Sequence, residues 1–212
     1  MTASPNPSSN SDAPLVHTSR SNIRSPTSSG IDYVFKLLML GEASVGKTSL
    51  THRYIRGVFV DSPRLTIGVD FFSKKMKIPD RNISAKLQIW DFGGEQRFRF
   101  LLPTYSKGAN ACLFLYDITA ADSLQSLPVW LEIVRKNAGN IPILLIGTKK
   151  DLEDHRVITT AEAFEEGKIN SVADHIELSA KTGEGVELSF EKITELLVKQ
   201  AKKLVEEQKN QD

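Results

Sequence analysis

The chain has 212 residues, of which 40% are hydrophobic and 25% are charged, and its formal net charge at pH 7 is +1. This length and composition predict one globular domain, or at most two. The near-neutral charge gives no support for a nucleic-acid partner. No stretch is long and apolar enough to span a bilayer, and the N-terminus lacks the apolar region of a signal peptide. A single cysteine, Cys112, excludes an internal disulfide and favours a reducing, cytoplasmic compartment.

Residues 1–30 differ in composition from the rest of the chain. They hold four prolines among many serines and asparagines, with few large apolar side chains. Such a segment buries too little surface to offset its chain entropy, which predicts a disordered N-terminal extension. We favour an inert solvated tail over a regulatory or membrane-touching one. A transit peptide is a further alternative, but the prolines disfavour the amphipathic helix that it needs.

The first predicted strand, Val34–Leu40, leads directly into the most informative stretch of the chain. The next eight residues read G-E-A-S-V-G-K-T, a complete P-loop, and Lys47–Arg56 can continue as a helix. In this context backbone N–H groups cradle phosphate oxygens, helped by the helix dipole. Lys47 can reach the β- and γ-phosphates, and the Thr48 hydroxyl can ligate Mg²⁺. The predicted nucleoside triphosphate site comprises Gly41, Glu42, Ala43, Ser44, Val45, Gly46, Lys47, Thr48 and Ser49.

The remainder of the chain alternates predicted strands and helices. Further strands are expected at Val69–Ile78, Ile83–Asp91, Ala111–Asp117, Ile143–Gly147 and His175–Leu178, and further helices at Phe98–Lys107, Ser123–Ala138, Thr159–Asn170 and Val186–Gln208. The second strand should pair antiparallel with the third through a turn at residues 79–82, and Pro128 should kink a helix near its start. These elements predict an α/β fold of the P-loop NTPase kind, a six-stranded, mostly parallel sheet with one antiparallel strand and helices on both faces.

Two short motifs follow buried-strand patterns in the second half of the chain. Residues 148–151 read T-K-K-D, and residues 179–181 read S-A-K. Each motif is weak alone, but their order and spacing after a P-loop are specific. With them the chain resembles the Ras-type small GTPases from about Val34 to Lys199, and the resemblance implies the Ras-like fold and a guanine nucleotide.

The resemblance also assigns residues to the guanine base. It implies that Asp151 accepts hydrogen bonds from the guanine N1–H and 2-amino groups, a donor pair that adenine lacks. The Lys149 stem would lie along the base, the Ala180 N–H would meet guanine O6, and Phe59 would pack edge-on. Most of the family has Asn where this chain has Thr148, but Rho-type members also carry Thr, so guanine binding should survive. The implied base site comprises Phe59, Thr148, Lys149, Asp151, Ser179, Ala180 and Lys181.

Two further segments resemble the family's switch loops. Residues 90–98 read W-D-F-G-G-E-Q-R-F where the family has W-D-T-A-G-Q-E-R-F. The match implies that Asp91 holds Mg²⁺ through a water and that the Gly94 N–H contacts the γ-phosphate. Glycine suits that position because the backbone must come close and be free in φ. Thr66 would ligate Mg²⁺ only beside a γ-phosphate, so both loops should be ordered by the triphosphate and released on hydrolysis.

Glu95 occupies the place of the family's water-positioning glutamine. A carboxylate can accept a hydrogen bond from the attacking water, but it cannot donate one, and it adds negative charge near a phosphate. Three outcomes stay open: Glu95 supports hydrolysis, repulsion pushes it outward and slows hydrolysis, or a register shift brings the Gln96 amide into place. The predicted catalytic set is Lys47, Thr66, Gly94 and Glu95, with a slow intrinsic rate unless a partner supplies an arginine.

Within the family the chain looks most like the Rab branch. Phe71, Trp90 and Tyr105 align with the aromatic triad on which Rab effectors pack, although they are equally explained as aromatics at the core edge. The D-F-G-G variant at residues 91–94 is similar to Rab-like GTPases of archaea related to eukaryotes. Thr2 excludes N-myristoylation, and the end of the chain lacks a prenylation cysteine. Membrane contact is therefore expected to be indirect or weak, unless the C-terminus is truncated.

The leading hypothesis is a monomeric Rab-like switch that binds GTP or GDP with Mg²⁺ and hydrolyses GTP. Its domain should span residues 31–200, with the end of the last helix and a polar tail at 201–212. It would meet effectors, an exchange factor and a GTPase-activating protein through its switch loops, in the cytoplasm or at a membrane surface, in traffic or signalling. One alternative is a GTP-binding interaction module with negligible hydrolysis. Another is an ATPase or a small-molecule kinase, against which Asp151 argues.

Overall fold

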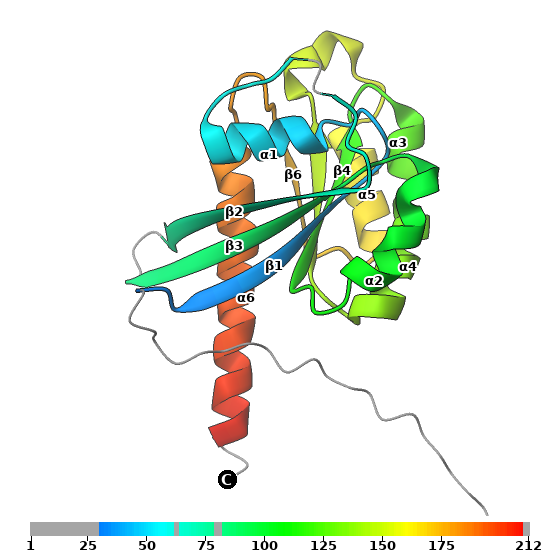
Figure 1. Cartoon of the computed structure of the whole chain (residues 1–212). Coiled ribbons are helices and arrows are strands. Elements are labelled where there is room, and N and C mark those ends of the chain that lie inside the picture. Colours follow the sequence, from blue (N-terminus) through cyan, green and yellow to red (C-terminus); the bar gives the residue numbers. More distant parts are fainter. Residues whose placement is uncertain (1–29, 62–63, 79–81, 210–212) are drawn as a thin grey trace, which may run out of the picture.

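The structure is a computed structural model of the whole chain, and it describes residues 30–61, 64–78 and 82–209 (Figure 1). Its centre is a six-stranded sheet in the order β2-β3-β1-β4-β5-β6. The strands are β1 (Tyr33–Leu40), β2 (Val69–Ile78), β3 (Ile83–Phe92), β4 (Ala111–Asp117), β5 (Ile143–Thr148) and β6 (Asp174–Glu177). The helices are α1 (Lys47–Arg56), α2 (Leu102–Tyr105), α3 (Ala121–Gln125), α4 (Leu127–Ala138), α5 (Thr160–Ile169) and α6 (Val186–Lys209), with 3₁₀ segments η1 (Gln96–Leu101) and η2 (Lys150–His155).

The pairing of the strands confirms the predicted sheet. β1 pairs parallel with β3 and β4, and β4, β5 and β6 continue in parallel. Of the six strands that the structure describes, only β2 runs antiparallel, against β3, with Phe71 opposite Trp90. The turn predicted at residues 79–82 lies largely outside the described residues, as does the extension predicted at residues 1–30. The predicted domain boundaries at residues 30 and 200 stay predictions.

Helices cover both faces of the sheet, as predicted, and each face has its own core. On one face α1 and α6 pack against the sheet through apolar side chains such as Leu50 and Phe190. On the other face, α2 to α5 bury Trp130, Leu131 and their neighbours (Figure 1). β4 and β5 are buried along their whole lengths, as expected of strands covered on both sides. Among the described residues, no helix has the length and apolarity needed to cross a bilayer.

Proline explains two breaks in the observed helices, of which the second was predicted. The helix predicted at Phe98–Lys107 is instead η1 followed by the four-residue α2, which has Pro103 in its first turn. Proline has no N–H to continue a helix from the preceding turn, so it begins a new one. Pro128 divides α3 from α4 in the same way, which confirms the predicted break. η2 was not predicted, because a polar 3₁₀ turn carries no apolar periodicity.

The carboxyl ends of the parallel strands bring the predicted motifs to one edge of the sheet. The P-loop follows β1, the T-K-K-D motif begins in the last residue of β5, and the S-A-K motif follows β6. Gly41, at the start of the P-loop, has φ of 135°, and a Cβ there would lie 2.2 Å from the Leu115 carbonyl oxygen. Only glycine fits between β1 and β4 at this point. Ligands of open α/β sheets bind at such an edge.

Candidate functional site

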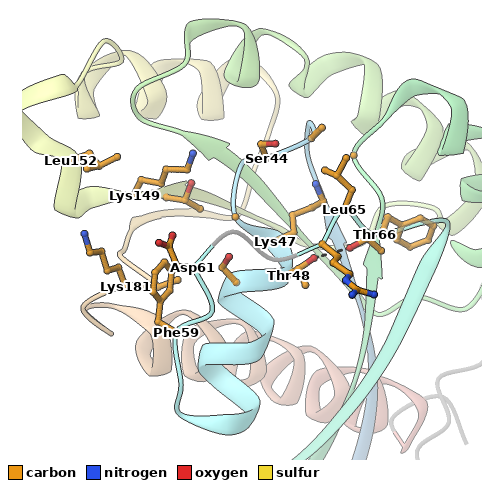
Figure 2. Close-up of a pocket in the computed structure, with 18 of the residues that line it drawn as sticks. Ser44, Lys47, Thr48, Phe59, Asp61, Leu65, Thr66, Lys149, Leu152 and Lys181 are labelled. Atoms are coloured by element: carbon orange, nitrogen blue, oxygen red, sulfur yellow. Dashed lines mark hydrogen bonds between the residues drawn. The ribbon is translucent and has the colours of Figure 1, made fainter.

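A pocket of about 580 Å³ opens at this edge of the sheet (Figure 2). Figure 2 shows Lys47, Thr48 and Thr66 at one end and Phe59 and Lys149 at the other. The predicted site residues that line it are Ala43, Ser44, Gly46, Lys47, Thr48, Ser49, Phe59, Thr66, Gly94, Glu95, Thr148, Lys149, Asp151, Ala180 and Lys181. The pocket therefore has two ends. The P-loop lies at one, which we call the phosphate end, and the T-K-K-D and S-A-K motifs lie at the other, which we call the base end.

Some predicted residues lie outside the lining, and other residues were missed. Gly41, Glu42, Val45, Asp91 and Ser179 do not line the pocket, although each contacts a residue that does or supports its backbone. The additional lining residues are Asp61, Arg64, Leu65, Phe92 and Leu152. Three of these lie between Phe59 and Thr66. The sequence could have indicated them, because both ends of that loop are predicted site residues.

The phosphate end is built around the buried Lys47. Gly46 precedes α1 in a left-handed conformation and, being glycine, has no side chain with which to cap the helix. The Lys47 Nζ donates to the carbonyl oxygens of Gly41 at 2.9 Å and Glu42 at 2.7 Å. Burial lowers the pKa of Lys47 to about 8, against the opposing effect of the charges on Asp91 and Glu42. A lysine beside a helix N-terminus that has no side-chain cap is suited to an anionic ligand.

Three oxygen-bearing side chains meet beside Lys47. The Thr48 hydroxyl donates to Asp91 Oδ2 at 2.6 Å and lies 2.8 Å from the Thr66 hydroxyl. Asp91 is fully buried, and its Oδ1 has no hydrogen-bond partner in the described part of the chain. Burial raises its pKa to about 6, although the hydrogen bond from Thr48 and the charge of Lys47 act the other way. Hydroxyl and carboxylate oxygens in this arrangement fit Mg²⁺, a hard cation that takes oxygen ligands.

Gly93 and Gly94 pack against the loops that carry these residues. A Cβ on Gly94 would lie 2.3 Å from the Ala43 backbone nitrogen, and one on Gly93 would lie 2.4 Å from the Thr66 carbonyl oxygen. Neither glycine has a positive φ. The expectation that Gly94 needs freedom in φ was therefore wrong, whereas close approach does require glycine here.

The base end is tied together by short side-chain contacts. Asp151 accepts a hydrogen bond from the Ser179 hydroxyl at 2.5 Å, so the T-K-K-D and S-A-K motifs are joined directly. The Thr148 hydroxyl is buried, and it contacts the carbonyl oxygens of Val45 at 2.6 Å and Tyr116 at 2.8 Å. Thr148 therefore links the end of β5 to the phosphate loop.

Lys149 is oriented by a carboxylate that the sequence did not single out. Its backbone is left-handed, with φ of 61°, and its Nζ lies 2.6 Å from Asp117 Oδ2. Asp117 is itself fixed at the end of β4, because its Oδ1 accepts from the Thr119 N–H and hydroxyl. The ion pair holds the Lys149 stem along the wall of the pocket, across from Phe59 (Figure 2).

A model of the Ras family matches residues 36–199, which is most of the chain. The chain belongs to the Ras family. The Ras-related protein Rab-2B of Dictyostelium discoideum is 39% identical to this GTPase over 173 residues, 81% of this chain and 84% of that relative. The predicted Rab-like small GTPase is thereby confirmed, and with it GTP binding as a family property. The narrower resemblance to archaeal Rab-like proteins stays a prediction.

In this GTPase Glu95 lines the phosphate end of the pocket and is paired with a cation. Arg97 Nε lies 2.6 Å from Glu95 Oε2, and the Arg97 side chain is 68% exposed. Gln96 is exposed at the start of η1 and does not line the pocket. In this conformation the residue that faces the phosphate end is therefore the carboxylate and not the neighbouring amide.

The three predicted partner-binding aromatics of the GTPase form a continuous cluster, in which Phe71 meets Trp90 edge to face and Tyr105 is tilted against Trp90. The rings of Phe71 and Trp90 are 5.2 Å apart, and those of Trp90 and Tyr105 are 5.4 Å apart. Phe71 is 53% exposed, whereas Trp90 and Tyr105 also pack against the core on the face of the sheet that α2 to α5 cover. The triad is therefore both a core edge and an accessible aromatic surface, so the two readings of it are compatible.

Proposed function

We propose that this Rab-like GTPase is a molecular switch that binds GTP or GDP with Mg²⁺ and hydrolyses GTP slowly. The observation that carries the proposal is the two-ended pocket, in which the P-loop faces one part and Asp151 faces the other. A guanine nucleotide needs both ends, because its phosphates require N–H donors and a cation while its base requires a carboxylate.

The residues of each end have distinct parts in binding. The phosphates would lie on the P-loop amides, with Lys47 moving its Nζ from the Gly41 and Glu42 carbonyls to the β- and γ-phosphates. Asp151 would accept from the guanine N1–H and 2-amino groups while Ser179 fixes its orientation. Adenine offers no such donor pair, so we expect strong selection against ATP.

The hydroxyls of Thr48 and Thr66 would hold Mg²⁺ directly, and Asp91 would hold it through a water. When bound, Mg²⁺ neutralises charge on the phosphates. The hydrogen bonds among these three side chains place their oxygens together in advance. Thr66 would act as a Mg²⁺ ligand only while the γ-phosphate is present, so its loop would be held in place with GTP and released with GDP.

Hydrolysis is the attack of a water on the γ-phosphorus, with cleavage of the bond to the β–γ bridging oxygen. Glu95 would accept a hydrogen bond from that water, and the Lys47 ammonium and the Gly94 N–H would stabilise the charge that develops. Repulsion between Glu95 and the phosphate is reduced by the ion pair with Arg97. This pair favours a hydrolysing switch over the alternative, a GTP-binding module with negligible turnover.

The cellular role is proposed from family membership. The chain's likeness to Rab proteins suggests membrane traffic or signalling, by analogy at the level of the family. Effectors, an exchange factor and a GTPase-activating protein would bind a monomeric switch through its two loops and the triad of Phe71, Trp90 and Tyr105. It would act in the cytoplasm or at the cytoplasmic surface of a membrane.

A single-turnover assay with GTP and Mg²⁺, run beside one with ATP, tests the proposal. We expect slow release of phosphate from GTP only. The Glu95→Gln variant should turn over at a rate within about tenfold of the parent, because both side chains can accept from the water. Glu132→Gln, at an exposed position on α4, is the matched control. Intact bound GTP in the parent, with hydrolysis restored in Glu95→Gln, would establish the non-hydrolysing module instead.

A further inference from the structure

Three side chains form a cluster behind the phosphate loop, outside the nucleotide pocket. Arg99 Nη2 lies 2.5 Å from Glu42 Oε1, and the Trp130 Nε1–H donates to the same oxygen at 2.9 Å. The Arg99 guanidinium carbon also lies 4.7 Å from the centre of the Trp130 ring. We call these three residues the clasp. It joins the phosphate loop, η1 and α4, which are far apart in the sequence.

The clasp is shielded enough to hold η1 in place. Trp130 is completely buried, and the side chains of Arg99 and Glu42 are only 21% and 29% exposed. A charge-assisted hydrogen bond and a cation–π contact both gain strength when water is largely excluded. Arg99 Nε, however, is buried with no acceptor within the described ranges. Because an unpaired buried N–H is unfavourable, it lowers the stability of the closed clasp. A change in η1 can therefore open the clasp.

The clasp is connected to the phosphate end of the pocket by short contacts. The Glu42 carbonyl oxygen accepts from Lys47 Nζ at 2.7 Å. The Gly94 backbone lies so close to Glu42 that a Cβ would be 2.4 Å from the Glu42 carbonyl oxygen. Gly94 and Glu95 directly precede η1, which carries Arg99. Glu42 therefore contacts both the loop before η1, through its backbone, and η1 itself, through its carboxylate.

We propose, on the basis of the proposed hydrolytic function, that Arg99 is a positioning residue for GTP hydrolysis. Its clasp on Glu42 and Trp130 fixes η1 against the phosphate loop and thereby places Glu95 at the phosphate end of the pocket. The same contacts carry the nucleotide state to α4, because a movement of Gly94 must change the geometry around Trp130.

The first test compares single-turnover hydrolysis at saturating GTP with GTP affinity. Arg99→Met keeps the length of the side chain but removes the guanidinium. We expect hydrolysis to slow by about 10- to 100-fold, since a misplacement of about 1 Å can cost about 100-fold. GTP affinity should stay within about threefold, because Arg99 does not line the pocket. Arg99→Lys should give an intermediate rate, since lysine restores the charge but not the planar stack. Lys107→Met, at an exposed position just beyond α2, is the control.

A second test asks whether the clasp residues act together. The chain has only two tryptophans, so a Trp90→Phe background leaves Trp130 as the sole tryptophan. In that background, with excitation at the red edge of the tryptophan band where tyrosine absorbs little, we expect the Trp130 emission to differ between GDP and a non-hydrolysable GTP analogue, and Arg99→Met should abolish the difference. Glu42→Gln and Arg99→Met should slow hydrolysis by less in combination than the product of their separate effects, as expected for residues in contact.

Each outcome of these tests decides the proposal. An unchanged hydrolysis rate in Arg99→Met overturns it. So does a fall in GTP affinity as large as the fall in rate, because Arg99 would then be merely structural. If the parent protein binds GTP without hydrolysing it, the proposed hydrolysis fails but the emission measurement still decides the coupling. Loss of the nucleotide-dependent emission in Arg99→Met supports the clasp, and its persistence overturns it.

Discussion

In the proposed function a single side chain, Asp151, would set the choice of base. The Ser179 hydroxyl donates to its Oδ1, so the carboxylate is oriented before any ligand arrives. A preoriented acceptor loses less freedom on binding than a mobile one, which favours both affinity and selectivity. The same logic applies to Lys149, whose ion pair with Asp117 fixes its direction along the pocket.

An Asp151→Asn substitution tests this assignment. The amide presents one donor and one acceptor, so it matches xanthine, which has a carbonyl where guanine has the 2-amino group. We expect GTP affinity to fall by about 100-fold, or about 3 kcal/mol, and the affinity for xanthosine triphosphate to rise. Titration calorimetry with both nucleotides measures the change, and Asp154→Asn in the same 3₁₀ segment is the control. Undiminished GTP affinity in Asp151→Asn would remove Asp151 from the base site.

A Thr48→Ala substitution tests the proposed Mg²⁺ ligands. Without the hydroxyl, Mg²⁺ should bind less tightly, and GDP should dissociate about tenfold faster, equivalent to about 1.4 kcal/mol. A chelator should accelerate GDP release from the parent protein but should change the variant much less. The rate of release of a fluorescent GDP, measured with and without chelator, distinguishes the loss of Mg²⁺ from a general weakening of the GDP site. An equal response of both proteins to the chelator would contradict this assignment.

At the scale of elements, the two segments proposed to recognise the base are joined by an ion-pair clamp. Arg156, at the end of η2, donates two hydrogen bonds to Glu177 in β6, at 2.9 and 2.7 Å, and it also pairs with Glu153. The Arg156 and Glu177 side chains are only 14% and 9% exposed. η2 carries Asp151, and β6 leads into Ser179, so the clamp sets the distance between the two motifs.

We expect Arg156→Met to loosen both motifs at once. Loss of the charged hydrogen bonds to Glu177 should lower the free energy of unfolding by about 2 kcal/mol and accelerate GDP release about tenfold. Denaturant unfolding and GDP release measure these two effects. Lys168→Met, which removes an exposed ion pair with Glu165, is the control and should change the stability by less than about 0.5 kcal/mol. A stability loss with unchanged GDP release would show that the clamp does not affect nucleotide binding.

The stabilisation by this clamp should also depend on pH. Burial alone would raise the pKa of Glu177, but the hydrogen bonds from Arg156 and Thr160 outweigh it and lower the pKa. Since the pKa is lower in the folded chain, the stabilisation is complete above the ordinary glutamate value of about 4.3 and is lost as the pH falls through the folded-state value. The difference in stability between the parent and Arg156→Met should therefore shrink from pH 7 to pH 3. A constant difference would contradict this account.

At the scale of the whole molecule, the pocket lies where loops from both halves of the sheet converge. It takes residues from segments between Ala43 and Lys181, whose strands are held by two separate cores. A ligand in this pocket contacts the folded arrangement and not the unfolded chain, so it stabilises the whole fold by mass action.

Thermal unfolding in the presence of GDP or ADP measures this stabilisation of the fold by a bound nucleotide. At a GDP concentration about 1,000 times its dissociation constant, the stabilisation is about 4.1 kcal/mol. For a chain of this size each kcal/mol raises Tm by roughly 2–4 °C, so we expect a rise of about 8–16 °C. ADP at the same concentration should raise Tm by less than about 2 °C. Equal shifts with both nucleotides would argue against guanine selection and would favour the P-loop ATPase alternative.

The sequence alone was enough to predict those parts of the site and the fold that depend on local chain geometry. The P-loop, the T-K-K-D motif and the S-A-K motif each follow a predicted strand, and parallel strands place their carboxyl ends at one edge, so the pocket could be predicted before the strand order was known. The break at Pro128 was equally local, because a missing N–H acts within one turn.

Only the tertiary structure decided which side chains support those motifs. Glu42 was predicted as a nucleotide contact, yet its carboxylate pairs with Arg99 and with Trp130, which lies 88 residues away in the chain. Lys149 meets Asp117, and Arg156 meets Glu177, for the same reason. A backbone motif carries its geometry within a few residues, whereas a long polar side chain can reach several acceptors. Packing of distant elements selects one of them, and no local pattern records that choice.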